Sequence, residues 1–284
     1  MAGTKNIKRQ IVSVKNTQKV TKAMKMVSAA KMRRANEAMQ ATNPYAAKIK
    51  EVAVHLSGLS GDNEPHPYMI ARKEVKNIAL LLINSDRGLC GAFNSNVVRM
   101  ATRFREEHPG KTLKLFIVGK NAYDYFKKQP HEIIEKWTSL GGKISYDTAK
   151  RISDSVTDSF MKEKYDELYL IYNEFRSVSV QYPKTEKIMP LSFEGSETQR
   201  DYLFEPKPAE LLAQILPRYV TFSIYHKLLE SAAGEHGARM VAMDNATRSA
   251  DDMVKKLTLN YNKARQAAIT KDLLDIVNGA EALK

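Results

Sequence analysis

Two glycine-bearing turns in the middle of the chain are the patterns in this sequence that most resemble a nucleotide-binding motif. Gly88-Leu89-Cys90-Gly91 follows a strand-like apolar run and precedes a helical stretch, as a phosphate-binding turn would, but it lacks the third glycine of a dinucleotide fingerprint. Gly119-Lys120 lacks the spacer and first glycine of a P-loop, and Asn121 occupies its Ser/Thr position. We therefore predict no bound nucleotide and no other cofactor.

No other residue pattern predicts catalysis. The sequence has no Cys/His spacing typical of a metal site, no nucleophile motif, and a single cysteine, Cys90, which excludes an internal disulfide and suits a reducing compartment. The N-terminus lacks the apolar core of a secretory signal, and no run of about 18 apolar residues could span a bilayer. We expect a soluble protein without an active site or a metal site.

The net charge of +13 is concentrated near the N-terminus. Residues 1–50 carry twelve Lys or Arg and one acidic residue, Glu37. This excess of basic over acidic residues is larger than that of an ordinary solvated helix face, so it predicts an acidic partner. Nucleic acid is one candidate, although the first 44 residues contain no stacking aromatic residue, and an acidic protein surface is the other.

The last part of the chain, from about Pro208 to Leu283, is predicted to form one amphipathic helix. Its stripe alternates in steps of three and four residues, a period of 3.5 that is typical of a coiled-coil seam. At about 1.5 Å per residue the helix would be roughly 110 Å long. The stripe consists of Leu212, Ile215, Tyr219, Phe222, His226, Leu229, Ala233, His236, Met240, Met243, Thr247, Ala250, Val254, Leu257, Tyr261, Ala264 and Ala268.

Its expected partner is a helix from about Thr4 to Leu56, which we predict to kink at Pro44 and to end in the turn residues that follow Gly58. Its stripe is weaker, because the phase slips between three stretches: Ile7, Ile11 and Val14; Val20, Met24 and Val27; Met32, Ala35 and Met39.

The region between these helices predicts a parallel, doubly wound sheet, because apolar runs alternate with helical stretches. The runs are residues 75–83, 113–118 and 168–172, and the helices end near residues 107, 128 and 164. Ser177–Tyr182 predicts one further strand, antiparallel to its predecessor. The predicted fold is α/β: a long antiparallel coiled coil of the N- and C-terminal helices (1–60 and 206–284) with an inserted Rossmann-like α/β domain (61–205).

The C-terminal helix would outrun its partner by about 20 residues, or roughly 30 Å. Nothing in the chain remains to cover the apolar side chains of this overhang, so we expect them to insert into another protein. They are Ile269, Leu273, Ile276, Ala280 and Leu283, with Leu274 and Val277 beside them.

Four long motifs make the chain recognisable: Ser13–Ala30 (SVKNTQKVTKAMKMVSAA), Ser85–Asn94 (SDRGLCGAFN), Glu235–Val254 (EHGARMVAMDNATRSADDMV) and Leu257–Gly279 (LTLNYNKARQAAITKDLLDIVNG). Through them the chain resembles the gamma subunit, the central stalk, of the rotary ATP synthase. The resemblance implies a non-catalytic rotor shaft inside a ring of three alpha and three beta subunits. It also implies an α/β foot on the c-ring with the epsilon subunit, and rotation that couples proton flow to ATP synthesis or hydrolysis.

The resemblance also assigns roles to particular residues. Met24 and Lys25 match the family's pair near the acidic lever of the beta subunit, and the apolar tip would turn in a sleeve. A polar group that contacts the beta catch loop is matched by Arg265, Gln266 and Thr270, and contacts to the c-ring loops by Tyr202 and Glu205.

The departures from the family pattern are few. Gly237 replaces a common alanine, and Gly234 precedes it, so two mid-helix glycines, each costing on the order of 1 kcal/mol, would soften the shaft.

The lack of a cysteine pair argues against the redox-regulated chloroplast type. A start at Met1 without a transit segment suggests bacteria, and hence a peripheral position on the cytoplasmic face of the plasma membrane. The coupling ion, proton or sodium, stays open.

Overall fold

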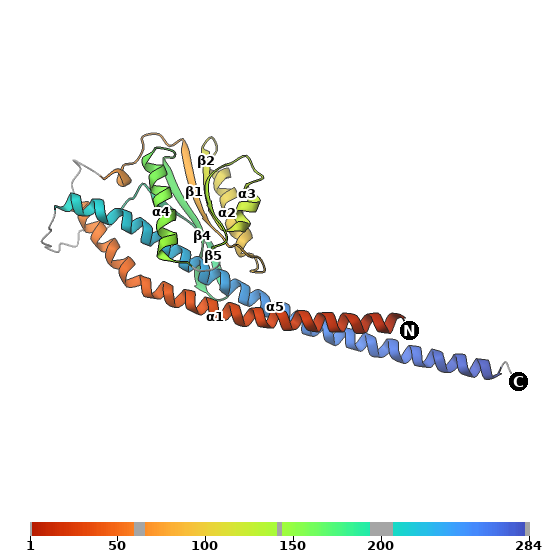
Figure 1. Cartoon of the computed structure of the whole chain (residues 1–284). Coiled ribbons are helices and arrows are strands. Elements are labelled where there is room, and N and C mark those ends of the chain that lie inside the picture. Colours follow the sequence, from red (N-terminus) through yellow and green to blue (C-terminus); the bar gives the residue numbers. More distant parts are fainter. Residues whose placement is uncertain (1, 60–65, 141–143, 194–206, 282–284) are drawn as a thin grey trace. The chain divides into compact units, whose positions relative to one another are not determined.

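The structure, a computed structural model, describes residues 2–59, 66–140, 144–193 and 207–281 (Figure 1). Long helices begin and end the chain, and a sheet with shorter helices lies between them in sequence, which confirms the predicted fold class. The elements are α1 (Ala2–Leu59), a 3-10 turn (Pro67–Met69), β1 (Asn77–Ile83), α2 (Phe93–Glu107), β2 (Thr112–Val118), α3 (Lys120–Phe126), β3 (Glu132–Trp137), α4 (Tyr146–Met161), β4 (Glu167–Ser177), β5 (Val180–Met189) and α5 (Pro208–Glu281).

The chain forms two compact units, one of residues 1–28 with 239–284 and one of residues 29–238. In each of them α1 and α5 pair antiparallel. In the first unit Thr21 contacts Thr247, the hydroxyl oxygens lying 2.8 Å apart. In the second, the rings of Tyr45 and Phe222 lie 4.1 Å apart. The predicted antiparallel pairing of the two end helices is therefore present within both units.

The sheet has the strand order β3-β2-β1-β4-β5. Strand β1 pairs parallel with β2 and β4, β2 pairs parallel with β3, and β5 pairs antiparallel with β4. Helices cover both faces, which is why β1 and β2 are continuous apolar runs rather than alternating ones. Along β1, side chains at 78, 80 and 82 pack toward α2 and α3, whereas those at 79, 81 and 83 pack toward α4 and α5.

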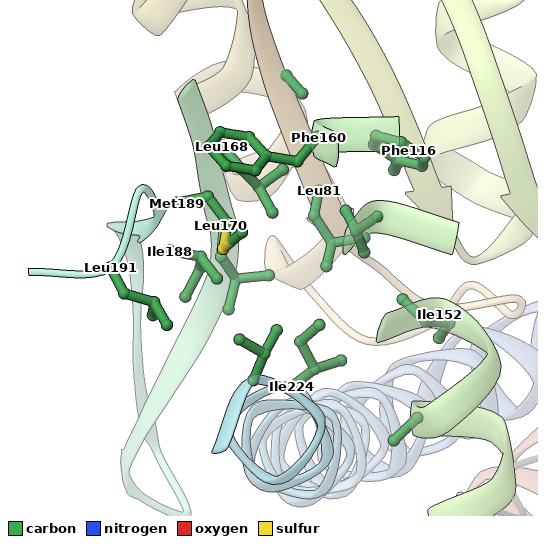
Figure 2. Close-up of a cluster of buried hydrophobic side chains, with 14 of the residues drawn as sticks. Leu81, Phe116, Ile152, Phe160, Leu168, Leu170, Ile188, Met189, Leu191 and Ile224 are labelled. Carbon is green, nitrogen blue, oxygen red and sulfur yellow. The ribbon is translucent and has the colours of Figure 1, made fainter. Parts of the chain in front are cut away.

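Helix α5 contributes to the core of the α/β domain as well as to the helix pair. Figure 2 shows Ile224 of α5 in one cluster with Leu170 of β4 and Ile152 of α4. All three side chains are fully buried. Burial of an aliphatic side chain contributes about 1.5–3 kcal/mol, so the domain depends on this helix for its stability.

Several boundaries differ from the sequence prediction. Strand β3 was not predicted, because its residues EIIEKW mix charged with apolar side chains at the sheet edge. The stretch Ser177–Tyr182 is not one strand. Ser177 pairs with Val180, so a hairpin turn interrupts the alternation that had suggested a single element. As predicted, α5 is one unbroken helix, and it includes Pro217; α1 likewise continues through Pro44, where the kink stays a prediction.

The seam of α1 also differs in its middle stretch. Val20 and Val27, predicted to face α5, are 57% and 56% exposed, whereas Thr21 and Ser28 are buried. The prediction was wrong by one position along the helix, because small hydroxyl side chains rather than valines occupy the contact. Met24, the third member of that stretch, is half-buried.

Candidate functional site

The C-terminal end of α5 carries exposed apolar side chains, as predicted. Every residue from Ile269 to Asn278 is exposed. The exposed fraction is 52% at Ile269, 57% at Leu273, 68% at Ile276 and 56% at both Leu274 and Val277. The side chain of Ala280 and all of Leu283 lie outside the described residues. We call Ile269, Leu273, Ile276 and Val277 the apolar tip.

The tip begins where the seam ends. Every residue between the last five stripe positions is exposed, while these five are half-buried: Val254, Leu257, Tyr261, Ala264 and Ala268. Beyond Ala268 this periodic burial stops, although the helix continues to Glu281. Within the described part of the chain, the apolar tip therefore has no covering partner.

The predicted contact residue Lys25 is already engaged within the chain. Its Nζ lies 2.5 Å from Oδ1 of Asp244, and Oδ2 of the same carboxylate accepts a hydrogen bond from Arg248. The hydrogen bond from Lys25 lowers the pKa of the Asp244 carboxyl, against the opposing effect of burial. Met24 beside it is half-buried. The ion pair of Lys25 with Asp244 therefore joins α1 to α5. Lys25 also lies on the face predicted to contact the beta subunit.

Sequence reasoning missed a polar section of the seam around this ion pair. The hydroxyls of Thr21 and Thr247 are 2.8 Å apart, and the Gln18 amide donates to Asp251 over 3.4 Å. Each threonine hydroxyl is also within hydrogen-bond distance of a carbonyl one turn back in its own helix. The signal in the sequence was Thr247, which interrupts an otherwise apolar stripe.

The polar group Arg265, Gln266 and Thr270 lies on exposed helix surface at the start of the overhang. The hydroxyl of Thr270 donates to the carbonyl of Gln266 over 3.0 Å, so it is satisfied without a partner protein. Positions 266 and 270 share a face with Ile269 and Leu273, because residues three and four apart on a helix are neighbours. Tyr202 and Glu205, the predicted c-ring contacts, lie outside the described residues.

The carboxylate of Asp86 accepts hydrogen bonds from the turn at Gly119-Lys120 and from the segment that follows β3. Oδ1 of Asp86 accepts hydrogen bonds from the backbone N–H groups of Lys120 (3.0 Å) and Ser139 (2.9 Å), and Oδ2 from that of Leu140 (3.0 Å). These donors are the kind that a phosphate would use. The protein therefore supplies its own anion at this position.

The second glycine turn is closed by backbone packing. Gly119 has a φ of +100°, and a Cβ there would lie 2.4 Å from the carbonyl oxygen of Asn84. The glycine thus serves a close approach between the ends of β1 and β2. A nearby recess lined in part by Leu228 and Glu235 holds about 50 Å³, far below the ~300 Å³ of a small-molecule site.

Other classes of site are not found in the described part of the chain. No three His, Cys, Asp or Glu side chains gather there in a way that could hold a metal ion. No helix in that part has an apolar stretch long enough to cross a membrane.

Comparison with known proteins gives a consistent result over the full length. A protein-family model described as ATP synthase matches residues 3–283. The chain is 44% identical over 287 residues to the ATP synthase gamma chain of Pelotomaculum thermopropionicum, covering 100% of both chains. It is 43% identical over 289 residues to that of Geotalea uraniireducens, with the same coverage.

Solved structures match in fold. A chain from the central stalk and c-ring of the Tetrahymena thermophila mitochondrial ATP synthase superposes with a TM-score of 0.61 at 25% identity, over 80% of this chain and 99% of that one. A chain from the rotor of the Euglena gracilis mitochondrial ATP synthase gives 0.68 at 19% identity, over 94% and 99%. The second likeness concerns the fold alone.

Proposed function

The chain belongs to the family of ATP synthase gamma chains, and we therefore propose that it is the rotor shaft of an ATP synthase. In this role it couples ion-driven rotation of a c-ring to ATP synthesis or hydrolysis in a ring of three alpha and three beta subunits, with an epsilon subunit beside its α/β domain. As a gamma chain it is part of an enzyme complex. The alternative of a nucleic-acid-binding coiled coil is not favoured by these comparisons.

The observation that supports a shaft most directly is the apolar tip. A helix that keeps half or more of four aliphatic side chains exposed is suited to insertion into another protein. An apolar sleeve would bind such a tip without directional bonds, so that the tip could turn in it. Arg265, Gln266 and Thr270, just before the overhang, would then meet the beta subunits.

The basic face of α1 supports an acidic partner surface. Lys15, Lys19 and Lys22 are exposed, and none of them forms an ion pair with another described residue. Because Lys25 is paired with Asp244, which also pairs with Arg248, we infer that the contact at Met24 and Lys25 involves this ion cluster and not a free ammonium group. The exposed lysines would then supply the net charge that attracts the beta lever.

We further propose that the chain performs no chemistry itself and acts on the cytoplasmic face of a bacterial plasma membrane, bound through the c-ring. The Asp86 carboxylate, which takes the anion-binding donors of the sheet edge, supports the absence of a nucleotide site. Tyr202 and Glu205 stay as proposed c-ring contacts.

Native mass spectrometry of the tagged chain purified from its own cells tests this function, with Mg-ATP hydrolysis assayed on the same sample. We expect one copy of the chain with three copies each of two larger subunits, and no hydrolysis by the isolated chain. A dimer carrying nucleic acid, or turnover by the chain alone, would overturn the proposal.

A further inference from the structure

A charged cluster joins α5 to the β4–β5 hairpin within the unit of residues 29–238. Lys227 of α5 donates to the hydroxyl of Tyr172 over 2.6 Å, and that hydroxyl donates to Glu186 over 3.0 Å. The Lys227 ammonium also lies 3.2 Å from Glu230. The exposed fractions of the Lys227, Glu230 and Glu186 side chains are 18%, 9% and 26%. We call these four residues the hairpin clamp.

The clamp holds the strand backbone as well as side chains. Oε1 of Glu230 accepts the backbone N–H of Phe175 in β4 over 3.1 Å, which ties one turn of α5 directly to the sheet. At its outer end the cluster continues through Lys184, which pairs with Glu186 at 2.7 Å and with Glu174 at 3.3 Å. Burial opposes ionisation of Glu186, but the hydrogen bond from Lys184 and the charge of Lys227 prevail and lower its pKa. Glu186 is therefore ionised at neutral pH.

The two mid-helix glycines allow the hairpin to lie against α5. A Cβ at Gly234 would be 3.3 Å from Cγ of Gln181, and one at Gly237 would be 3.2 Å from the carbonyl oxygen of Val178. Gln181 in turn donates to the carbonyl of Val178 over 2.9 Å and so holds the turn closed. The two glycines that were predicted to soften the helix are therefore the positions at which α5 packs closely against the hairpin.

A partly buried ion cluster is a poor source of stability, since apolar side chains of similar size often stabilise a fold as well or better. An ion cluster differs from apolar packing in how strongly its energy depends on orientation. Hydrogen bonds weaken steeply when their angles change, whereas hydrophobic contact is non-directional. Twisting α5 about its own axis against the sheet would misalign the bonds of Lys227 and Glu230 together.

We propose that the hairpin clamp is the torque-bearing joint between the α/β domain and α5, with Lys227 and Glu230 as its positioning residues. This inference rests on the proposed function as a rotor shaft. In that shaft, torque that acts on the α/β domain has to be transmitted to α5. The clamp joins the domain to this helix through directional bonds.

The test uses the complete membrane-bound complex carrying Lys227→Met, which keeps the aliphatic stem but removes the charge. ATP hydrolysis and ATP-driven ion pumping into vesicles are measured on the same preparation. We expect hydrolysis to persist while the ions pumped per ATP fall, because the joint slips under load. Lys150→Met, which removes an exposed ion pair on α4, is the matched control and should leave pumping unchanged.

An engineered disulfide between α5 and the hairpin distinguishes a joint that slips from a chain that is misfolded. Gln181→Cys with Gly234→Cys is the pair to cross-link, because a Cβ at position 234 would lie 3.3 Å from Cγ of Gln181. The sulfur of a cysteine at position 181 takes the place of that Cγ, within reach of the second cysteine. Oxidation should restore pumping to the Lys227→Met complex, and reduction should abolish the recovery. Unchanged pumping in Lys227→Met, or a loss that the cross-link does not repair, would overturn the proposal. A complex lacking this chain, or a native complex that pumps nothing, would instead contradict the proposed function.

Discussion

Replacing the apolar tip by serine should leave the isolated chain intact and weaken its assembly. The perturbation is Ile269→Ser, Leu273→Ser, Ile276→Ser and Val277→Ser together. These side chains are 52–68% exposed, and substitutions at exposed sites usually change stability by no more than about 0.5 kcal/mol each. For contrast, Met243 in the seam is 5% exposed, and truncating it to alanine should cost about 2–5 kcal/mol.

The effect on assembly follows from the area left to bury. Complete burial of an aliphatic side chain contributes about 1.5–3 kcal/mol. Because somewhat more than half of each tip side chain is exposed, insertion would gain roughly 1 kcal/mol per residue and about 4 kcal/mol for four. At about 1.4 kcal/mol per tenfold change, the dissociation constant should rise on the order of 10³-fold.

The assay is titration of the labelled chain into purified alpha and beta subunits, beside denaturant unfolding of the isolated chain. Met161→Ser, at an exposed apolar residue of α4, is the matched control and should change neither measurement. A dissociation constant altered by less than about tenfold would refute insertion of the tip. Unfolding that shifts by several kcal/mol would show instead that the tip packs within the chain.

Three further predictions concern the helices. Deleting Lys271–Lys284 should loosen the proposed bearing but leave the contacts of Arg265, Gln266 and Thr270, so the truncated chain still assembles with alpha and beta subunits in native mass spectrometry; complete failure to assemble would contradict this division. A double-mutant cycle of Thr21→Val and Thr247→Val should give a coupling free energy of about 0.5–1.5 kcal/mol in denaturant unfolding, since one hydrogen bond joins the hydroxyls, and additive effects would argue against that bond. Burial and then the Lys227 charge lower the pKa of His226 below its ordinary 6.5, so the unfolded chain takes up a proton first as pH falls and stability declines below about pH 6.5; unfolding midpoints at pH 7.5 and 5.5 should differ less in His226→Gln, and an equal difference would exclude this histidine as a source.

The sequence was most informative where one kind of contact persists along an element. The runs that became β1 and β2 are mostly apolar because helices cover both faces of the sheet. The stripe of α5 keeps its spacing as far as Ala268, where its periodic burial ends. The overhang could be predicted by comparing helix lengths alone.

Prediction failed where polar side chains satisfy one another across the fold. Hydropathy placed Val20 and Val27 in the seam, but Thr21 fits there because its hydroxyl lies within hydrogen-bond distance of the hydroxyl of Thr247. The pairing of Lys25 with Asp244 joins residues 219 positions apart, which a single sequence does not reveal. Contacts to other subunits depend equally on the partner's surface, so the assignments at Arg265, Gln266 and Thr270 stay predictions.

The Asp86 carboxylate has a consequence for how the α/β domain responds to its surroundings. In doubly wound sheets, ligands ordinarily bind beyond the carboxyl ends of the strands, where the strand order reverses. Here β1 lies at that reversal, and a covalently attached anion holds the backbone donors next to it. An attached anion cannot dissociate when metabolite concentrations change. The donors that Asp86 occupies are therefore held by the chain's own side chain, whatever the concentration of nucleotides around it.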